Sequence, residues 1–262
     1  MSDLPSVLIT GASSGIGAVY ADRFARRGHD LVLVARDEAR MEALASTLRA
    51  ETGVLIDVLK ADLTQASDLA AVSGRLREDD RIGVLINNAG ASLGGSFDKQ
   101  SGADLHSLIA LNVSAVVELA NAIAPRLARS GSGAIVNIGS IVGLAPEFGL
   151  TAYGATKAFV LYLSQGLAVE MSPKGVYVQA VLPAGTRTEI WARSGADIDN
   201  LPPLMDVADL VDAALVGFDR REPVTIPPLQ DAALWDAFQG ARQVMLPGFA
   251  TTVPADRYRE QA

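Results

Sequence analysis

The sequence contains no cysteine, and this absence removes several kinds of chemistry at once. Without thiols there is no disulfide, no thiolate nucleophile and no cysteine-ligated metal. Histidine is almost as scarce, since only His29 and His106 occur and they lie far apart along the chain. We therefore predict that the protein has no metal site.

Positive charge and long apolar runs are also in short supply. The formal net charge is -8, whereas nucleic acids and anionic membranes both attract basic surfaces, so neither is expected as a partner. The opening stretch "MSDLPSVLIT" lacks a basic start, and we find no apolar run of about 18 residues. We expect no signal peptide, no membrane span and a cytoplasmic location.

The chain does have a regular alternation of short apolar runs with longer helical patterns. The runs that predict strands are 6–10, 31–35, 54–62, 84–90, 134–140, 176–183 and 224–227. The helical patterns are 18–28, 37–51, 65–79, 102–129, 150–172, 206–218 and 231–243. Nearly all-apolar strands that alternate with helices are typical of a parallel sheet covered on both faces.

We therefore predict one α/β domain over 1–262, a Rossmann-type doubly wound parallel sheet of about seven strands with helices on both faces. Ligands bind such sheets at the carboxyl ends of the strands. The looser segment 187–205 is expected to cover that site as a lid, and 245–262 to form a C-terminal tail.

A glycine-rich stretch, "TGASSGIG" at 10–17, follows the first strand and opens the first helix. Gly11 suits a tight turn, Gly15 lets the backbone approach a pyrophosphate, and Gly17 lets the helix pack near the strand. The free N–H groups of the helix start then face phosphate. The alternative is a glycine-rich turn with no ligand.

The end of the second strand indicates which nucleotide is bound. An acidic residue there would accept hydrogen bonds from the ribose hydroxyls and repel a 2′-phosphate, but this sequence has Ala35 and then Arg36. A guanidinium binds phosphate well, and Ser13 and Ser14 add hydroxyl donors. NADP(H) is thus favoured over NAD(H). Arg36 is alternatively a solvated residue at a helix start, and Arg40 is a weaker candidate.

Seven motifs follow one another in a characteristic order. They are "TGASSGIG" (10–17), "ADL" (61–63), "NNAG" (87–90), "LNVSA" (111–115), "NIGS" (137–140), "YGATK" (153–157) and "PAGTRT" (183–188). The set resembles the single-domain branch of the short-chain dehydrogenase/reductase family, from about residue 5 to 230.

The resemblance implies a nucleotide site. Asp62 would bond the adenine amino group, and Thr186 and Thr188 would hold the carboxamide and pyrophosphate. The implied nucleotide-binding residues are Gly11, Ser13, Ser14, Gly15, Ile16, Gly17, Arg36, Asp62, Leu63, Asn88, Ala89, Gly90, Tyr153, Lys157, Pro183, Gly185, Thr186 and Thr188. The sequence has Ala184 where the family usually has glycine after proline, which either narrows the nicotinamide side or simply fits differently.

The resemblance also implies a catalytic tetrad of Asn112, Ser140, Tyr153 and Lys157. Ser140 would hold the substrate oxygen, and Asn112 would kink its helix and hold a water for proton relay. A cation about 4 Å from a phenol contributes about 4 kcal/mol at an effective dielectric of about 20, or about 3 pKa units. Lys157 is therefore expected to bring the pKa of Tyr153 from about 10 close to neutrality. Taken singly, each residue is also consistent with capping or packing.

The substrate is the least constrained prediction. Leu93, Val142, Phe148 and Trp191 are candidates for an apolar pocket, although ordinary packing is an equal alternative. We expect a neutral, fairly apolar ketone or secondary alcohol. Apolar residues beyond one face of the helices at 102–129 and 150–172 favour a homodimer or homotetramer.

Two functions stay open. The first is an NADP(H)-dependent oxidoreductase that transfers a hydride between nicotinamide C4 and a carbonyl or secondary alcohol. The second is a catalytically idle NADP(H)-binding regulator or scaffold. The intact set of Ser140, Tyr153 and Lys157 favours the enzyme, because a binder has no need of it.

Overall fold

The apolar strands assemble into one seven-stranded sheet in the order β3-β2-β1-β4-β5-β6-β7. The computed structural model describes residues 4–189 and 203–259. The strands are β1 Ser6–Thr10, β2 Leu31–Ala35, β3 Ile56–Lys60, β4 Ile82–Asn87, β5 Ala134–Ile138, β6 Tyr177–Val181 and β7 Val224–Thr225. All neighbouring strands run parallel, which confirms the predicted Rossmann-type fold.

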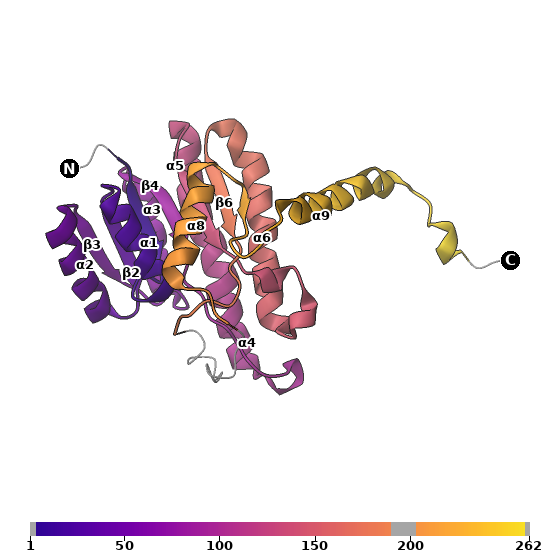
Figure 1. Ribbon diagram of the computed structural model, residues 1–262, viewed down its shortest axis with the longest axis horizontal. Helices are drawn as coiled ribbons and strands as arrows, with labels where there is room; N and C mark the ends of the chain where they lie inside the picture. Colours follow the sequence, from indigo (N-terminus) through magenta and orange to yellow (C-terminus); the bar gives the residue numbers. More distant parts are fainter. Residues whose placement is uncertain (1–3, 190–202, 260–262) are drawn as a thin grey trace. The chain divides into compact units, whose positions relative to one another are not determined.

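Helices cover both faces of the sheet, as Figure 1 shows. They are α1 Gly15–Arg26, α2 Glu38–Thr52, α3 Ala66–Glu78, α4 Gly102–Ile109, α5 Ala115–Ser130, α6 Thr151–Met171 and α8 Val207–Asp219. Successive strand residues point to opposite faces, so Ile9 packs with the helices α1, α2 and α8, and Leu8 packs with α3 and α5. The all-apolar strands are thus explained by burial on two sides.

Several predicted strands were too long at their carboxyl ends. The runs 54–62, 84–90, 134–140 and 176–183 give strands that end at Lys60, Asn87, Ile138 and Val181. The residues that follow leave the sheet and line a cavity instead. The strand order reverses between β1 and β4, which is where such folds place their ligands.

The predicted helix 102–129 is interrupted by a π-helical turn, Ala110–Ser114, between α4 and α5. By length and composition the whole run Gly102–Ser130 is apolar enough to cross a membrane, so the expectation of no such run was wrong. Its apolar residues Leu119, Ile123 and Leu127 pack in the core on the α3 side of the sheet. We therefore attribute its hydrophobicity to the domain core.

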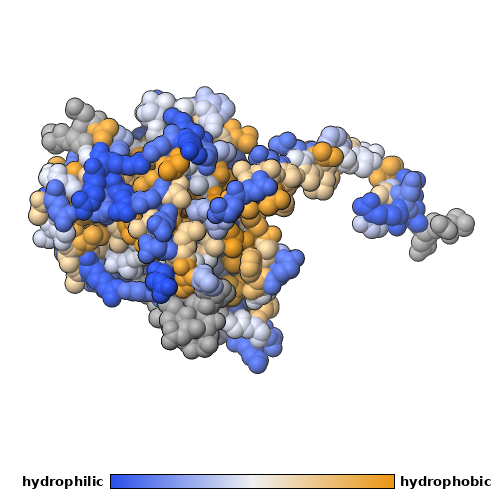
Figure 2. All heavy atoms as spheres, in the orientation of Figure 1, coloured by the Kyte–Doolittle hydropathy of each residue, from blue (hydrophilic) through white to orange (hydrophobic). Residues whose placement is uncertain are grey.

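The chain divides into two compact units, Met1–Pro227 and Pro228–Ala262. The second contains helix α9 (Ala232–Met245) and two short 3-10 helices, Leu246–Ala250 and Asp256–Tyr258. Apolar residues stand among polar ones on the surface of α9 (Figure 2). The large exposed apolar side chains of this unit are Leu234, Phe238, Val244, Met245, Leu246, Phe249, Val253 and Tyr258.

Candidate active site

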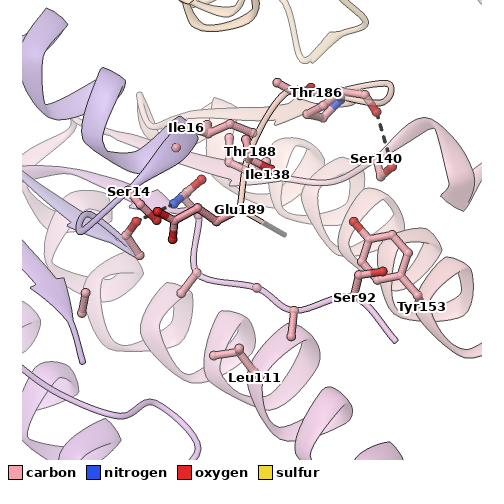
Figure 3. A pocket seen from close by; sticks show the side chains of 18 of the residues that line it. Ser14, Ile16, Ser92, Leu111, Ile138, Ser140, Tyr153, Thr186, Thr188 and Glu189 are labelled. Atoms are coloured by element: carbon pink, nitrogen blue, oxygen red, sulfur yellow. Dashed lines mark hydrogen bonds between the residues drawn. The ribbon is translucent and has the colours of Figure 1, made fainter. Parts of the chain in front are cut away.

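A cavity of about 1460 Å³ lies at the carboxyl ends of the strands, and its lining residues all belong to the first unit. Pockets for drug-sized molecules are usually about 300–1,000 Å³, so this cavity has room for a larger ligand or two ligands. Figure 3 shows Ser92, Ser140 and Tyr153 on one side of the cavity and Ser14 and Glu189 on another. The cavity thus has two chemically distinct ends.

The glycine loop has the backbone that its spacing predicts. Gly11 and Gly15 adopt φ angles of 66° and 55°, in the left-handed region that favours glycine. A Cβ on Gly17 would lie 2.4 Å from the Gly11 carbonyl oxygen. Ser13, Ser14, Gly15 and Ile16 line the cavity, whereas Gly17 does not. Gly17 therefore permits close packing, and the residues before it present backbone to a ligand.

Thr10 supports the loop from below, and the sequence analysis did not assign it a role. Its buried hydroxyl accepts hydrogen bonds from the N–H groups of Asn88 (3.0 Å) and Ala89 (2.9 Å). The Asn88 amide in turn donates to the Thr10 carbonyl at 2.9 Å. These bonds fix the ends of β1 and β4 together, so that Asn88, Ala89 and Gly90 line the cavity.

Arg36, Asp62 and Leu63 line the end of the cavity at β2 and β3, as the motifs predict. Asp62 accepts hydrogen bonds from the N–H group (3.0 Å) and hydroxyl (2.7 Å) of Thr64. Arg40 instead forms an ion pair with Glu189 at 2.7 Å and does not line the cavity. Of the two arginines, only Arg36 is placed to meet a ligand.

Residues 183–189 form the wall beside the glycine loop. Pro183, Ala184, Gly185, Thr186 and Thr188 all line the cavity. The Thr188 methyl would be 3.3 Å from a Cβ placed on Gly15, so a side chain at Gly15 would be in tight contact with this wall. Backbone hydrogen bonds from Arg187 to Met205 (3.0 Å) and from Met205 to Gly185 (2.9 Å) hold it in place.

Ser140, Tyr153 and Lys157 meet at the other end of the cavity. The Ser140 hydroxyl donates to the Pro183 carbonyl at 3.3 Å, and it also accepts from the Val142 N–H, which caps the 3-10 helix Ile141–Gly143. Ser140 thus caps a helix, which was the alternative to a catalytic role. Its hydroxyl nevertheless faces the cavity beside Tyr153 (Figure 3). The two roles coexist.

The pKa values of Tyr153 and Lys157 differ from those expected from the sequence. Burial raises the pKa of Tyr153 to about 12, although a hydrogen bond with Ser140 partly offsets this. Burial also lowers the pKa of Lys157 to about 8. The lysine ammonium donates to the Ile138 carbonyl at 2.8 Å and lies 5.7 Å from the centroid of the Tyr153 ring. In this structure burial is therefore the main cause of both pKa shifts.

Asn112 lies in the π-helical turn and is buried outside the cavity lining. Its amide oxygen accepts from the Ala91 N–H at 2.9 Å, and its amide nitrogen donates to the Ala91 carbonyl at 2.9 Å and to the Thr156 hydroxyl at 3.0 Å. Thr156 donates to the Tyr153 carbonyl at 2.7 Å. Asn112 is thus a brace between the 88–91 segment and α6, and Thr156, inside "YGATK", is a partner that we had not predicted.

The predicted apolar pocket is only partly described. Leu93, Val142 and Phe148 line the cavity, whereas Trp191 and most of the expected lid lie outside the described residues. Further residues that line the cavity, not predicted from the sequence, are Ser92, Asp104, Ser107, Leu108, Leu111, Leu150, Pro203 and Leu204. Their positions in the sequence carry no local signal, because only folding brings them to the cavity.

The sequence model described as short chain dehydrogenase matches residues 5–199. The chain belongs to the short-chain dehydrogenase family. The predicted family is therefore confirmed, and two solved structures match this short-chain dehydrogenase over nearly its whole length. One is a short-chain dehydrogenase from Sphingobium yanoikuyae in complex with NADPH, 65% identical, with a TM-score of 0.96, covering 98% of this chain and 100% of that chain.

The second is the bulky-bulky ketone specific alcohol dehydrogenase from Comamonas testosteroni. It is 58% identical, with a TM-score of 0.92, over 98% of this chain and 99% of that chain. A curated relative, the very-long-chain 3-oxoacyl-CoA reductase of Anas platyrhynchos, is 32% identical over 207 residues, or 75% of this chain. The chain spans only 64% of that relative's length. Membership of the family thus leaves the substrate open.

Proposed function

We propose that this protein is an NADP(H)-dependent oxidoreductase with Tyr153 as its general acid and base. It interconverts a carbonyl group and a secondary alcohol on a neutral, fairly apolar small molecule. The observation that carries the proposal is the meeting of Ser140, Tyr153 and Lys157 in one cavity that also contains the glycine loop. The NADPH complex of the 65% identical relative supports the choice of nucleotide.

The residues present fit a dinucleotide. The segment after β4 would crowd any side chain at Gly11, because its Cβ would lie 2.8 Å from the Asn88 amide nitrogen. Helix α1 begins at Gly15 and directs its unpaired N–H groups toward the cavity, which suits a pyrophosphate. Arg36 supplies a cation for a 2′-phosphate. When bound, the nucleotide supplies or accepts the hydride at nicotinamide C4.

The protein's own part is to hold the substrate oxygen and move one proton. Ser140 is positioned to donate a hydrogen bond to that oxygen, which fixes it beside Tyr153. In reduction, the Tyr153 hydroxyl gives its proton to the oxygen as negative charge develops there; in oxidation, the phenolate takes it back. A pKa of about 12 keeps Tyr153 protonated near neutral pH, as the donor role requires. The base role requires phenolate, so the pKa of Tyr153 must then fall.

Lys157 is the group that can favour the phenolate. Its ammonium is held below the tyrosine ring by the Ile138 carbonyl, at 2.8 Å. An opposite charge at such a range favours the ionised form of the phenol. Because burial places the pKa of Lys157 at about 8, the lysine changes charge close to neutral pH. When Lys157 is protonated, its charge favours loss of the Tyr153 proton. When Lys157 is neutral, Tyr153 holds its proton more firmly.

The cavity wall favours uncharged substrates with large substituents. The cations that line it, in the part of the chain that the structure describes, are Arg36, Lys60 and Lys157. The first two lie at the β2 and β3 end, and the Lys157 ammonium is already bonded to a carbonyl, so none is free for a substrate carboxylate. Asp104 also lines the cavity, and its carboxylate repels anions. The 58% identical relative that is specific for bulky-bulky ketones supports a ketone with two large groups.

We further propose that the protein is a cytoplasmic homodimer or homotetramer that associates through α4–α5 and α6. Tyr162 and Val169 on α6 are 80% and 77% exposed, and Ile109 and Val117 add apolar surface on α4 and α5. Large exposed apolar side chains grouped on helices are typical of interaction surfaces.

The test is a panel of ketones and aldehydes assayed by the loss of NADPH or NADH absorbance. Turnover of bulky ketones with NADPH is expected. Tight NADPH binding without turnover of any member would favour the idle binder instead. Arg36→Ala should weaken NADPH and leave NADH nearly unchanged, with Arg40→Ala as the matched control because Arg40 does not line the cavity. Equal loss with both nucleotides would refute the role of Arg36.

A further inference from the structure

A second cation lies near Arg36 at the β2 and β3 end of the cavity. In the β2–β3 ladder, Ala35 is the register partner of Lys60, so the two strands end side by side with Arg36 next along the chain. Both Arg36 and Lys60 line the cavity. The sequence of either strand alone does not show this proximity, because 23 residues separate the two cations along the chain.

The two cations are poorly neutralised in the part of the chain that the structure describes. Among those residues the Arg36 guanidinium forms no hydrogen bond or ion pair, although its charge reaches one carboxylate: burial opposes the effect, but hydrogen bonds from Thr64 and the charge of Arg36 lower the pKa of Asp62. The Lys60 ammonium lies 3.9 Å from a carboxylate oxygen of Glu38, a loose pair in which the side chains are 63% and 58% exposed. Such an exposed pair is weak, and the lysine is easily drawn to a stronger anion.

The other carboxylates at this end already have partners. Asp37 accepts from the Arg40 N–H at 3.1 Å and caps helix α2. Asp62 is bonded to Thr64, and Glu189 is paired with Arg40 at 2.7 Å. Glu38 is thus the carboxylate that competes directly for Lys60, while Arg36 is left to act on a ligand.

We propose that Lys60 is a second cation of the 2′-phosphate site, and that Glu38 competes with the phosphate for it. The inference rests on the proposed use of NADP(H). A phosphate monoester carries nearly two negative charges at neutral pH and accepts several hydrogen bonds, so one guanidinium does not neutralise it. Lys60 can leave Glu38 at little cost because their pairing is long and exposed.

The direct test uses isothermal titration calorimetry with two fragments, adenosine 2′,5′-bisphosphate and adenosine 5′-monophosphate. Lys60→Met should weaken the bisphosphate about 5-fold, as expected for one exposed charge, and leave the monophosphate unchanged. Arg36→Ala should weaken the bisphosphate by about 10-fold or more, because a guanidinium makes charge-assisted hydrogen bonds. Lys60→Arg should retain binding. Lys174→Met, which removes another exposed lysine, is the matched control.

Glu38 gives a second test with the opposite sign. Glu38→Gln should tighten the bisphosphate about 2-fold to 5-fold, because it frees Lys60 from its competitor. The same substitution in the Lys60→Met background should have no such effect. This double-mutant comparison separates competition for Lys60 from a general change in the charge of the rim.

The outcomes distinguish the inference from the proposed function. If Lys60→Met weakens both fragments equally, or neither, or if Glu38→Gln tightens binding without Lys60, the role of Lys60 is refuted. If Arg36→Ala removes the preference for the bisphosphate and Lys60→Met leaves it unchanged, the NADP(H) proposal stands and the inference fails. If the wild-type protein shows no preference for the bisphosphate, the NADP(H) proposal itself fails.

Discussion

The buried side chain of Asn112 donates a hydrogen bond of 3.0 Å to the hydroxyl of Thr156, and this bond joins the π-helical turn to helix α6. The Thr156 hydroxyl in turn donates a hydrogen bond to the Tyr153 carbonyl at 2.7 Å. The helix that carries the tyrosine is therefore tied to the segment beside β4 through two side chains, neither of which lines the cavity.

Replacing Thr156 by valine keeps the shape and removes the hydroxyl. It leaves an Asn112 amide proton buried without a partner, which costs about 1–3 kcal/mol. For a protein of this size we expect the Tm to fall by about 2–10 °C in differential scanning calorimetry. Thr156→Ser, which keeps the hydroxyl, should stay close to wild type. A valine variant as stable as wild type would show that the bond contributes nothing.

Replacing Tyr153 by phenylalanine removes the proposed acid and base but keeps the ring. Turnover should fall by about 100-fold to 10,000-fold, the usual contribution of general acid–base catalysis. NADPH affinity, measured by fluorescence titration, should change little. Tyr162→Phe alters a tyrosine of the same helix that is 80% exposed, and it should leave both quantities unchanged. Turnover retained by the Tyr153 variant would rule out the mechanism.

Lys157 predicts a pH dependence of stability. Its pKa is about 8 in the folded protein against an ordinary value of 10.5, so between these values the unfolded chain binds more protons. The free energy of unfolding should therefore rise with pH across this window, and the contribution is lost as the pH falls through about 8. Lys157→Met removes the titrating group and with it the rise.

Urea denaturation of the two proteins from about pH 7.5 to about pH 9.5 measures this difference. The upper limit avoids the tyrosines, whose raised pKa values act with the opposite sign above about pH 10. If the free energies of unfolding of wild type and Lys157→Met changed with pH in parallel across this range, Lys157 would have the same pKa in the folded and unfolded chain.

The proposed helical interface predicts that a charge on α6 breaks the oligomer. Val169→Asp places a carboxylate where 77% of the side chain is exposed, so the folded subunit should tolerate it. Light scattering after size-exclusion chromatography should then report the monomer mass. Val216→Asp on α8, 47% exposed and on the other face of the sheet, is the control and should leave the oligomer intact. An unchanged mass for the Val169 variant would place the interface elsewhere.

The sequence alone was sufficient for the features that depend on local pattern. All-apolar strands such as 31–35 predict burial on both faces, and the order of the motifs predicts the family. The glycine spacing predicts the turn at Gly11 and the close packing at Gly17, because both follow from the missing Cβ. The strand and glycine patterns each lie within a short stretch, and the order of the motifs is read directly along the chain, so no knowledge of distant contacts is needed.

Tertiary structure alone decided what depends on distant residues. The sequence suggested that Lys157 would lower the pKa of Tyr153, but burial beneath several elements raises it and directs the ammonium to Ile138. The pairing of β2 with β3 is what brings Lys60 beside Arg36. The π-helical turn at Asn112 likewise depends on Ala91 and Thr156, which belong to other segments. Electrostatic environment and side-chain partners are set by packing, and a linear pattern does not contain them.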